Sequence, residues 1–352
     1  MATASSSLEQ FLGKMLGDIG AAMSGSLVLI GDKLGLYRAL AEHGPMDAAE
    51  LARRTETTER NIREWLAAQA ASGYVNYDAA TQKYSMSPEQ IAVLADEKSE
   101  FCMLGGFECI ASTYKDEPLV TNSFRSGRGV GWHEHSQCLF RGTERFFRAG
   151  YASHLVQDWL PALDGVVEKL KRGAKVADIG CGHGASTILM AQAFPNSQFV
   201  GFDYHLASIH RAEQAARDVG VADRCNFEVA SAKEFGGNDY DLVAVFDCLH
   251  DMGDPVGAAK HIRQSMRDDG TWMIVEPFAN DATADNLNPL GRIFYAASTM
   301  VCVPASQNQE VGLALGAQAG EARLREVVQS GGFTRVRRAA ATPFNLILEA
   351  RP

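Results

Sequence analysis

Apolar and polar positions in the second half of the chain form short buried runs that alternate with amphipathic stretches. The runs are rich in β-branched and aromatic residues, which is typical of strands, and the stretches between them have helical spacing. The runs are KVADIG, QFVGFD, CNFEVA, YDLVAVFD and TWMIVE, and the helical stretches include ASTILMAQAF and HLASIHRAEQAARDVG. This order predicts a doubly wound parallel sheet that binds its ligand beyond the carboxyl ends of the strands.

The end of the chain departs from this alternation. GGFTRVRRAAATPFNLILEARP predicts a helix end at Gly331 and Gly332, followed by two strands joined by a short connection near Pro343. Strands joined so closely must run antiparallel. The sheet is therefore expected to end in an antiparallel strand.

The first 95 residues have a mostly helical pattern. Helical spacing runs through LEQFLGKMLGDIGAAM and LVLIGDKLGLYRAL, and two short helices follow, the second with Thr57 or Thr58 as N-cap. NYDAATQKYSMS then alternates and turns like a hairpin. Helix, turn, helix and wing is the order of a winged-helix domain, which first suggests DNA binding.

The charges of this domain argue against DNA. Residues 1–95 hold eight Lys and Arg against eleven Asp and Glu, and the expected recognition helix carries Glu59 and Glu64 beside Arg60 and Arg63. Such a helix offers phosphates no basic face. Because the first ~40 residues hold more apolar surface than a small winged helix can bury, we expect a homodimer built through this region.

Residues 96–165 read as a helical connector. It contains the Gly-rich loop of FRSGRGVGWHEHS, in which we expect Trp132 to help cover a ligand as part of a lid. His133 and His135 raise the question of a metal. Two histidines without a further thiolate or carboxylate cluster are a weak signal, so we expect no metal site.

Composition limits the location and the partners. The chain of 352 residues is long for one domain, and its 46% hydrophobic and 22% charged residues are typical of globular proteins. The seven cysteines have no regular spacing and are expected to be reduced. No signal peptide and no apolar run near ~18 residues is apparent, so we expect a cytoplasmic protein without a membrane partner. A net charge of −10 favours a small-molecule partner over nucleic acid.

The first strand ends in a glycine-rich loop. Gly180, Gly182 and Gly184 can turn the chain sharply into a helix and expose backbone N–H groups to a ligand. Asp203, at the end of the second strand, can accept hydrogen bonds from both hydroxyls of a ribose. A nucleoside cofactor is indicated, and nicotinamide dinucleotides use a similar pair of features.

The residues before and after these glycines distinguish the two cofactors. DIGCGHG, with Asp178 two positions before Gly180, resembles the first motif of class I S-adenosylmethionine-dependent methyltransferases, and GFD resembles the second. FDCLHDMGDP is similar to a segment of plant-type small-molecule O-methyltransferases and their bacterial winged-helix relatives. This resemblance covers nearly the whole chain. It implies a seven-stranded Rossmann-like sheet with an antiparallel last strand, a dimerising winged helix and S-adenosylmethionine as cofactor.

The resemblance also implies roles for single residues. It places His250 on the family's catalytic base and Glu276 on the carboxylate that orients it. The family's second carboxylate falls on or near Gln318, a departure that bears on hydroxyl deprotonation. The residues that it assigns to the cofactor are Asp178, Gly180, Gly182, Gly184, Asp203, Tyr204, Ser231, Ala232 and Asp247.

The acceptor is the least determined part of this interpretation. NPLGRIFYAASTMVCVPAS, residues 288–306, is an apolar helix inserted after the fifth strand. As acceptor wall, this helix would contribute Phe294, Tyr295 and Met300, together with Trp132 from the connector. An apolar or aromatic hydroxylated metabolite follows.

The sequence thus predicts three domains and leaves two classes of function. We predict a winged-helix or dimerisation domain in residues 1–95, a connector in 96–165 and a cofactor-binding methyltransferase domain in 166–352. The leading function is methyl transfer to a small molecule. A DNA-binding regulator that senses S-adenosylmethionine, and a methyltransferase acting on nitrogen, carbon or sulfur without a base, remain open.

Overall fold

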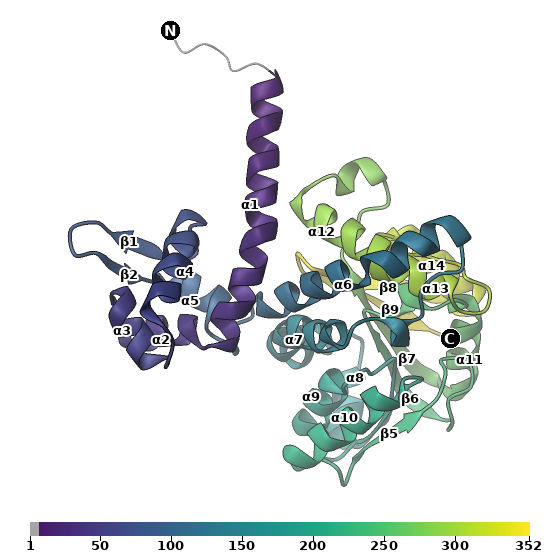
Figure 1. The fold of residues 1–352 in the computed structure, drawn as a ribbon. Coiled ribbons are helices and arrows are strands. Elements are labelled where there is room, and N and C mark those ends of the chain that lie inside the picture. Colours follow the sequence, from purple (N-terminus) through teal and green to yellow (C-terminus); the bar gives the residue numbers. More distant parts are fainter. Residues whose placement is uncertain (1–6) are drawn as a thin grey trace. The chain divides into compact units, whose positions relative to one another are not determined.

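The computed structural model describes residues 7–352, which divide into two compact units (Figure 1). The first unit comprises the chain up to Tyr114 together with Gln137–Ala149. The second comprises Lys115–Ser136 and Gly150–Pro352. Two helices, α6 (Leu104–Ser126) and α7 (Gln137–His154), each contribute to both units.

The first unit is a winged-helix domain, as predicted. Its elements are α1 (Ser7–Lys33), α2 (Leu36–His43), α3 (Ala48–Arg54), α4 (Glu59–Ala71), the hairpin β1 (Asn76–Asp78) and β2 (Lys83–Ser85), and α5 (Pro88–Leu94). Thr58 occupies the N-cap of α4, although its side chain makes no capping bond. Tyr37 and Trp65 pack edge to face in the core of this unit, with ring centroids 5.1 Å apart.

Helix α1 is longer than the sequence pattern suggested, because the first predicted helix and the beginning of the second run on without a break. Its C-terminal half is partly buried through Ser24, Gly25, Val28 and Gly31. Its N-terminal half extends away from the other helices of its unit (Figure 1). By length and composition alone α1 could cross a membrane. The apolar pattern of the sequence had predicted no membrane-spanning stretch.

The second unit is built on a seven-stranded sheet. Its strands are β3 (Lys175–Ile179), β4 (Gln198–Asp203), β5 (Cys225–Val229), β6 (Tyr240–Phe246), β7 (Met266–Pro277), β8 (Arg335–Ala341) and β9 (Asn345–Arg351). Their order is β5-β4-β3-β6-β7-β9-β8. β9 runs antiparallel to both β7 and β8, which confirms the expected antiparallel end of the sheet.

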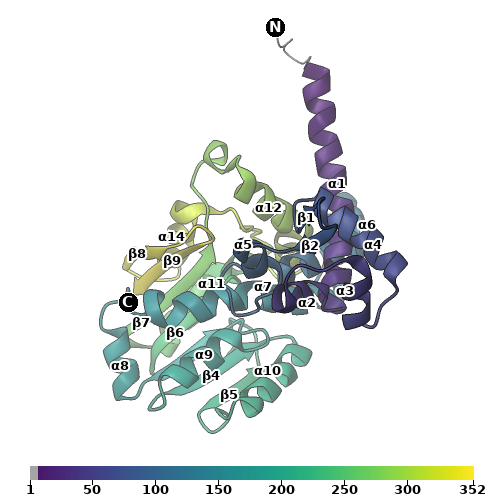
Figure 2. The ribbon, with the colours of Figure 1, turned by 90° about the vertical axis from the view of Figure 1, so that its left-hand side faces the viewer.

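Helices cover both faces of this sheet (Figures 1 and 2). The helices α8 (Val166–Arg172), α9 (Ala185–Ala193) and α10 (Leu206–Asp218) lie on one side, and α11 (Pro255–Ser265) and α14 (Gly320–Ser330) lie on the other. Ile262 of α11 and Leu324 of α14 pack against Ile274 and Trp272 of β7 in one buried cluster. The remaining elements of the unit are short: η1 (Trp132–Glu134), η2 (Leu155–Trp159), η3 (Leu249–Asp251), η4 (Thr283–Asn286), α12 (Pro289–Ala297), η5 (Ser298–Cys302) and α13 (Val303–Gln307).

The order in which the chain adds strands to the sheet changes side at β3. From β3 the chain proceeds to β4 and β5 on one side, then crosses back to β6 on the other. Loops that leave β3 and β6 therefore diverge and open a crevice at the carboxyl ends of these strands, where ligands of such sheets bind. The glycine loop follows β3, and the segment that contains His250 follows β6.

Candidate active site

The loop after β3 has the backbone geometry that the glycines predicted. Gly180, Gly182 and Gly184 all have positive φ, between 52° and 79°. A Cβ on Gly180 would come within 2.7 Å of the Cys248 sulfur, and one on Gly184 within 2.7 Å of the Phe227 ring. Gly182 has no atom within 4 Å of its Cβ position. The two outer glycines of the loop therefore pack against the protein, and the central one faces open space.

Two predicted carboxylates flank this loop. Asp203 accepts hydrogen bonds from the backbone N–H of Gly182 at 3.0 Å and of His205 at 2.8 Å. Asp178 is buried, and its Oδ2 accepts from the Ser186 and Thr187 hydroxyls at the start of α9. Its Oδ1 is also buried but accepts no hydrogen bond from the described residues. The site therefore holds a buried carboxylate oxygen that is available to a ligand.

A third carboxylate, Asp247, follows β6 in a strained conformation. Its φ is 49°, a left-handed value that is uncommon for a residue with a side chain. Tyr151 donates its hydroxyl to Asp247 at 2.7 Å, and Asn345 donates its amide at 3.1 Å. These two donors come from α7 and β9, far away in sequence, and they hold the carboxylate in place.

His250 and Glu276 form the central pair of the site. Glu276 lies near the end of β7, and one of its oxygens accepts from the backbone N–H of Leu249 at 2.9 Å. Its other oxygen lies 2.5 Å from Nδ1 of His250. Both side chains are almost fully buried. The predicted base and its predicted orienting carboxylate are thus in contact, with Nε2 left as the outward-facing nitrogen.

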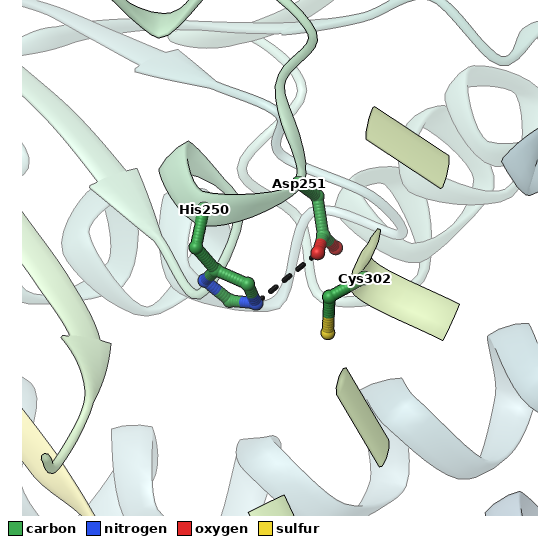
Figure 3. Close-up of side chains that lie close together, drawn as sticks. All are labelled: His250, Asp251 and Cys302. Atoms are coloured by element: carbon green, nitrogen blue, oxygen red, sulfur yellow. Dashed lines mark ion pairs between the residues drawn. The ribbon is translucent and has the colours of Figure 1, made fainter. Parts of the chain in front are cut away.

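The outward side of His250 faces Asp251 and Cys302 (Figure 3). Nε2 lies 3.2 Å from Oδ1 of Asp251, although the geometry is not that of a hydrogen bond. Cys302 reaches the same place from η5. The ligand atoms of the three side chains all lie within 4.8 Å of one another.

Hydrogen bonds from α13 and the chain after it hold this arrangement together. Ser306 donates its hydroxyl to the carbonyl of Met252 at 2.9 Å, and the Gln309 amide donates to the carbonyl of Asp251 at 2.9 Å. In return, the backbone N–H of Gly253 donates to the Gln309 side chain at 3.0 Å. The position of Cys302 beside His250 is therefore built into the fold.

Burial and mutual repulsion raise the pKa values of the acidic side chains of the site. Burial raises the pKa of Asp178 to about 6, despite the Ser186 and Thr187 hydroxyls that oppose the shift. Burial, reinforced by the Glu276 charge, raises the pKa of Asp247 to about 7. Burial also raises the pKa of Asp203. An excess of buried negative charge favours a cationic ligand.

Burial and neighbouring charges have opposite effects on the pKa of His250. Burial disfavours the imidazolium, but the carboxylates of Glu276 and Asp251 outweigh it and raise the pKa of His250 well above its ordinary value. The imidazole therefore holds its proton at neutral pH until another cation enters the site or the pH rises.

The other residues predicted for the cofactor have less distinctive contacts. Tyr204 follows Asp203 and is exposed, and Ala232 packs on the core of the sheet. The hydroxyl of Ser231 lies 3.2 Å from a Glu234 carboxylate oxygen. Gln318 donates to the backbone carbonyls of Phe278 and Ala317, so no carboxylate stands at that position.

The residues predicted for the acceptor differ in burial. Phe294 is buried in a small apolar cluster with Cys302 and Ala317, whereas Tyr295 and Met300 are half-buried on the same helical segment. Trp132 is half-buried in η1. Its loop is fixed to α13, because the N–H of Val130 donates to the carbonyl of Pro304 at 3.0 Å.

Several polar groups of the site had no signal in the sequence. Tyr151 and Asn345 hold Asp247 from distant elements, and only the fold brings them together. His135, from the HEH segment, is buried with Nδ1 3.1 Å from Asp116, whereas His133 is exposed. Nε2 of His135 is buried and makes no hydrogen bond with the described residues. The two histidines therefore have different surroundings.

Comparison with known families identifies both parts of the chain. Residues 170–332 match the family described as a methyltransferase domain, and residues 22–96 match the Rv2258c-like winged HTH domain. Together with the fold, these matches show that the chain contains a methyltransferase domain and carries a winged-helix domain at its N-terminal side. It is a methyltransferase whose cofactor is S-adenosylmethionine.

Individual relatives are similar but distant. The chain is 28% identical over 131 residues to 27-O-demethylrifamycin SV methyltransferase of Amycolatopsis mediterranei, a match that spans 35% of this chain and about half, 48%, of that protein. Mitomycin 7-O-methyltransferase MmcR has a TM-score of 0.70 at 19% identity, covering 99% of this chain and all of that one. Human N-acetylserotonin methyltransferase has a TM-score of 0.70 at 17% identity, covering 100% and 99%. At these identities the structures share the fold.

The buried acids generate a first prediction. S-adenosylmethionine carries a sulfonium and an ammonium, which lower the pKa of nearby carboxyls, so its binding at pH 7 should release protons, chiefly from Asp247, whose pKa is about 7. Calorimetry in two buffers of different ionisation enthalpy measures this release. S-adenosylhomocysteine, which lacks the sulfonium charge, should release fewer protons, and Asp247→Asn should reduce the release with either ligand. Proton uptake on binding of S-adenosylmethionine would contradict this account.

Proposed function

We propose that this methyltransferase transfers the methyl group of S-adenosylmethionine to a hydroxyl of a small apolar or aromatic metabolite, with His250 as general base. The observation that carries the proposal is the buried pair of His250 and Glu276, with 2.5 Å between Nδ1 and the carboxylate. Such a pairing fixes the ring and directs its other nitrogen toward the reacting group.

The residues around the glycine loop fit the cofactor. S-adenosylmethionine supplies a methyl group already activated by its sulfonium. Asp203, which accepts hydrogen bonds from the backbone N–H groups of Gly182 and His205, would hold the ribose. Asp178 would neutralise a cationic group with its Oδ1, which has no hydrogen-bond partner among residues 7–352. The open space at Gly182 allows a ligand to approach the backbone closely.

The chain's own part in the reaction is positioning and proton transfer. Glu276 holds Nδ1 of His250, so the proton of an acceptor hydroxyl would go to Nε2. The positive charge gained by the ring is stabilised by Glu276 on one side and Asp251 on the other. Alignment of acceptor and methyl group would supply the rest of the rate.

The acceptor class follows from the side chains that surround Cys302. Phe294, Leu290 and Phe344 make this surface apolar, and the buried acids next to it disfavour an anionic acceptor. Two of the similar proteins are a 27-O-demethylrifamycin SV methyltransferase and a mitomycin 7-O-methyltransferase. An uncharged hydroxylated aromatic compound is the acceptor that we propose.

The role of His250 can be tested directly. His250→Ala should lower turnover by ~10²- to 10⁴-fold, the usual contribution of a general base, while the affinity for S-adenosylmethionine stays near that of the wild type. Rates are measured with methyl-labelled S-adenosylmethionine and a panel of phenols with matched anilines and thiophenols. Near-normal turnover of the variant on the best acceptor would instead favour an amine or a thiolate nucleophile that needs no base.

The pH dependence gives a separate test. Because the imidazole must be neutral to accept a proton, kcat/KM for a hydroxyl acceptor should rise with pH, with a midpoint well above the usual value for histidine. Glu276→Gln removes the nearest negative charge and should move this midpoint to lower pH by roughly 1–3 units, while the plateau rate falls. An unchanged midpoint would show that His250 does not control the profile.

We further propose that the winged helix serves assembly and not DNA binding, and that the protein works in the cytoplasm. In α4, Arg60 pairs with Glu64 at 2.7 Å and Arg63 pairs with Glu59. The arginines of the expected recognition helix are thus compensated by their own helix, which leaves little positive charge for phosphates. A DNA-binding regulator would shift a DNA fragment in a gel run at physiological salt. We expect no such shift for this protein.

We propose that a second copy of the chain packs against the exposed half of α1. Seven large apolar residues are exposed there: Leu8, Phe11, Leu12, Met15, Leu16, Ile19 and Met23. Gly13, Gly17 and Gly20 lie between them with open space at their Cβ positions, so another helix can approach closely. A self-complementary contact of this kind forms a homodimer.

Substitutions within α1 test this assembly. The double variant Leu12→Glu, Leu16→Glu should be a monomer in sedimentation at concentrations where the wild type is a dimer, since charges cannot be buried in an apolar interface. Lys14→Ala, on the same helix, is the control and should leave the dimer intact. If the wild type sediments as a monomer and floats with lipid vesicles, α1 binds membranes and the dimer proposal is wrong.

A further inference from the structure

The cluster of His250, Asp251 and Cys302 contains the set of donor atoms that transition metals prefer. It offers an imidazole nitrogen, a carboxylate oxygen and a thiol sulfur, all within 4.8 Å of one another (Figure 3). Nitrogen, oxygen and sulfur ligands together favour zinc or a similar thiophilic cation over magnesium or calcium.

The distance between the nitrogen and the oxygen of this cluster is close to that of a zinc site. With Zn–N and Zn–O bonds of ~2.0–2.2 Å, the two ligand atoms of a tetrahedral site lie roughly 3.4 Å apart. Nε2 of His250 and Oδ1 of Asp251 are 3.2 Å apart and make no hydrogen bond with each other. A metal ion between these two atoms would take the place of their direct ion pair.

The surroundings also support a cation. A histidine that binds a metal usually donates its other nitrogen to a carboxylate, which fixes the ring, and Glu276 takes that position at 2.5 Å from Nδ1. Glu276 is itself buried and places its carboxylate against the ring. Cys302 is held near the cluster by the bonds that join α13 and Gln309 to the segment after His250.

We propose that His250 Nε2, a carboxylate oxygen of Asp251 and the Cys302 sulfur bind one thiophilic divalent cation, with a fourth position open to water or an acceptor oxygen. Binding displaces the proton of the Cys302 thiol and any proton on Nε2 into solution. The metal then occupies the nitrogen lone pair that a general base needs. Inhibition of methyl transfer follows from this competition and rests on the proposed function, whereas binding itself does not.

Cobalt(II) is the probe for binding, because a tetrahedral site with a thiolate ligand gives it visible absorption and a sulfur-to-metal charge-transfer band. Purified full-length protein, treated with a chelator and then titrated with Co²⁺ alone, should develop both features with one equivalent per chain. Cys302→Ser should lose the charge-transfer band and weaken binding at least ~10-fold, a scale set by the ~10- to 100-fold loss found for partners of metal-bound histidines. Cys138→Ser is the matched control and should retain the wild-type spectrum.

The results separate the proposal from its alternatives. Calorimetric binding of S-adenosylmethionine to Cys302→Ser verifies that the variant is folded. A wild-type spectrum typical of octahedral Co²⁺, or a charge-transfer band that persists in Cys302→Ser, would overturn the site. His250→Ala should also lose the tetrahedral spectrum, and its retention would remove His250 from the ligand set. These readouts need no acceptor, so they do not depend on whether methyl transfer to a hydroxyl is found.

A rate measurement tests the consequence. Once an acceptor is found, Zn²⁺ should inhibit the wild type and the Cys138→Ser control equally, and a chelator should restore the rate. Cys302→Ser should need at least ~10-fold more Zn²⁺ for the same inhibition. Equal inhibition of Cys302→Ser and wild type would show that zinc acts elsewhere.

Discussion

The contact between Glu276 and the segment after β6 is the interaction on which the site depends. One carboxylate oxygen accepts the backbone N–H of Leu249, and the other lies against Nδ1 of His250. Because Glu276 is itself part of β7, which pairs with β6 on one side and β9 on the other, the sheet fixes the ring. A histidine on a free loop would have to lose rotamer freedom in every catalytic cycle.

Burial of this carboxylate has an electrostatic cost that other parts of the site reflect. Asp178, Asp203, Asp247 and Asp251 have raised pKa values, and burial is the largest cause in each. The described residues place no lysine or arginine in contact with them. Their compensation is therefore expected from a ligand, and a cationic cofactor is the ligand that this class uses. The affinity for a sulfonium and the pKa of the base are consequently linked.

The sequence predicted those parts of the protein that depend on local patterns. The strands, the antiparallel end and the winged helix were confirmed, because period-two runs, glycine turns and helical spacing are local properties. Glu276 and His250 could be paired only through the family resemblance, since 26 residues separate them. The contacts of Tyr151 and Asn345 with Asp247 could not be predicted, because they join α7 and β9 to the end of β6.

The continuity of α1 was missed for a related reason. A helix ends where capping or a breaker interrupts it. The sequence pattern divided this region into two helical stretches at residues 24–26, and packing of the C-terminal half of α1 against α4 keeps the helix continuous there. Trp65 of α4 donates its indole N–H to the carbonyl of Leu27 at 2.9 Å, and Gly31 lies so close to the Trp65 ring that a Cβ there would clash. At Gly31 glycine permits close helix packing, a tertiary role that helix propensity does not include.

The geometry that would make His250 a general base would also make it a metal ligand. A general base needs an exposed lone pair on a fixed ring beside groups that stabilise positive charge, and a metal site needs the same lone pair with further donors around it. Asp251 and Cys302 supply those donors here. A chain that kept His250 and Glu276 but replaced Cys302 with an aliphatic residue would keep the base and lose the sulfur ligand. Cys302 is therefore the residue that separates the two properties of this site.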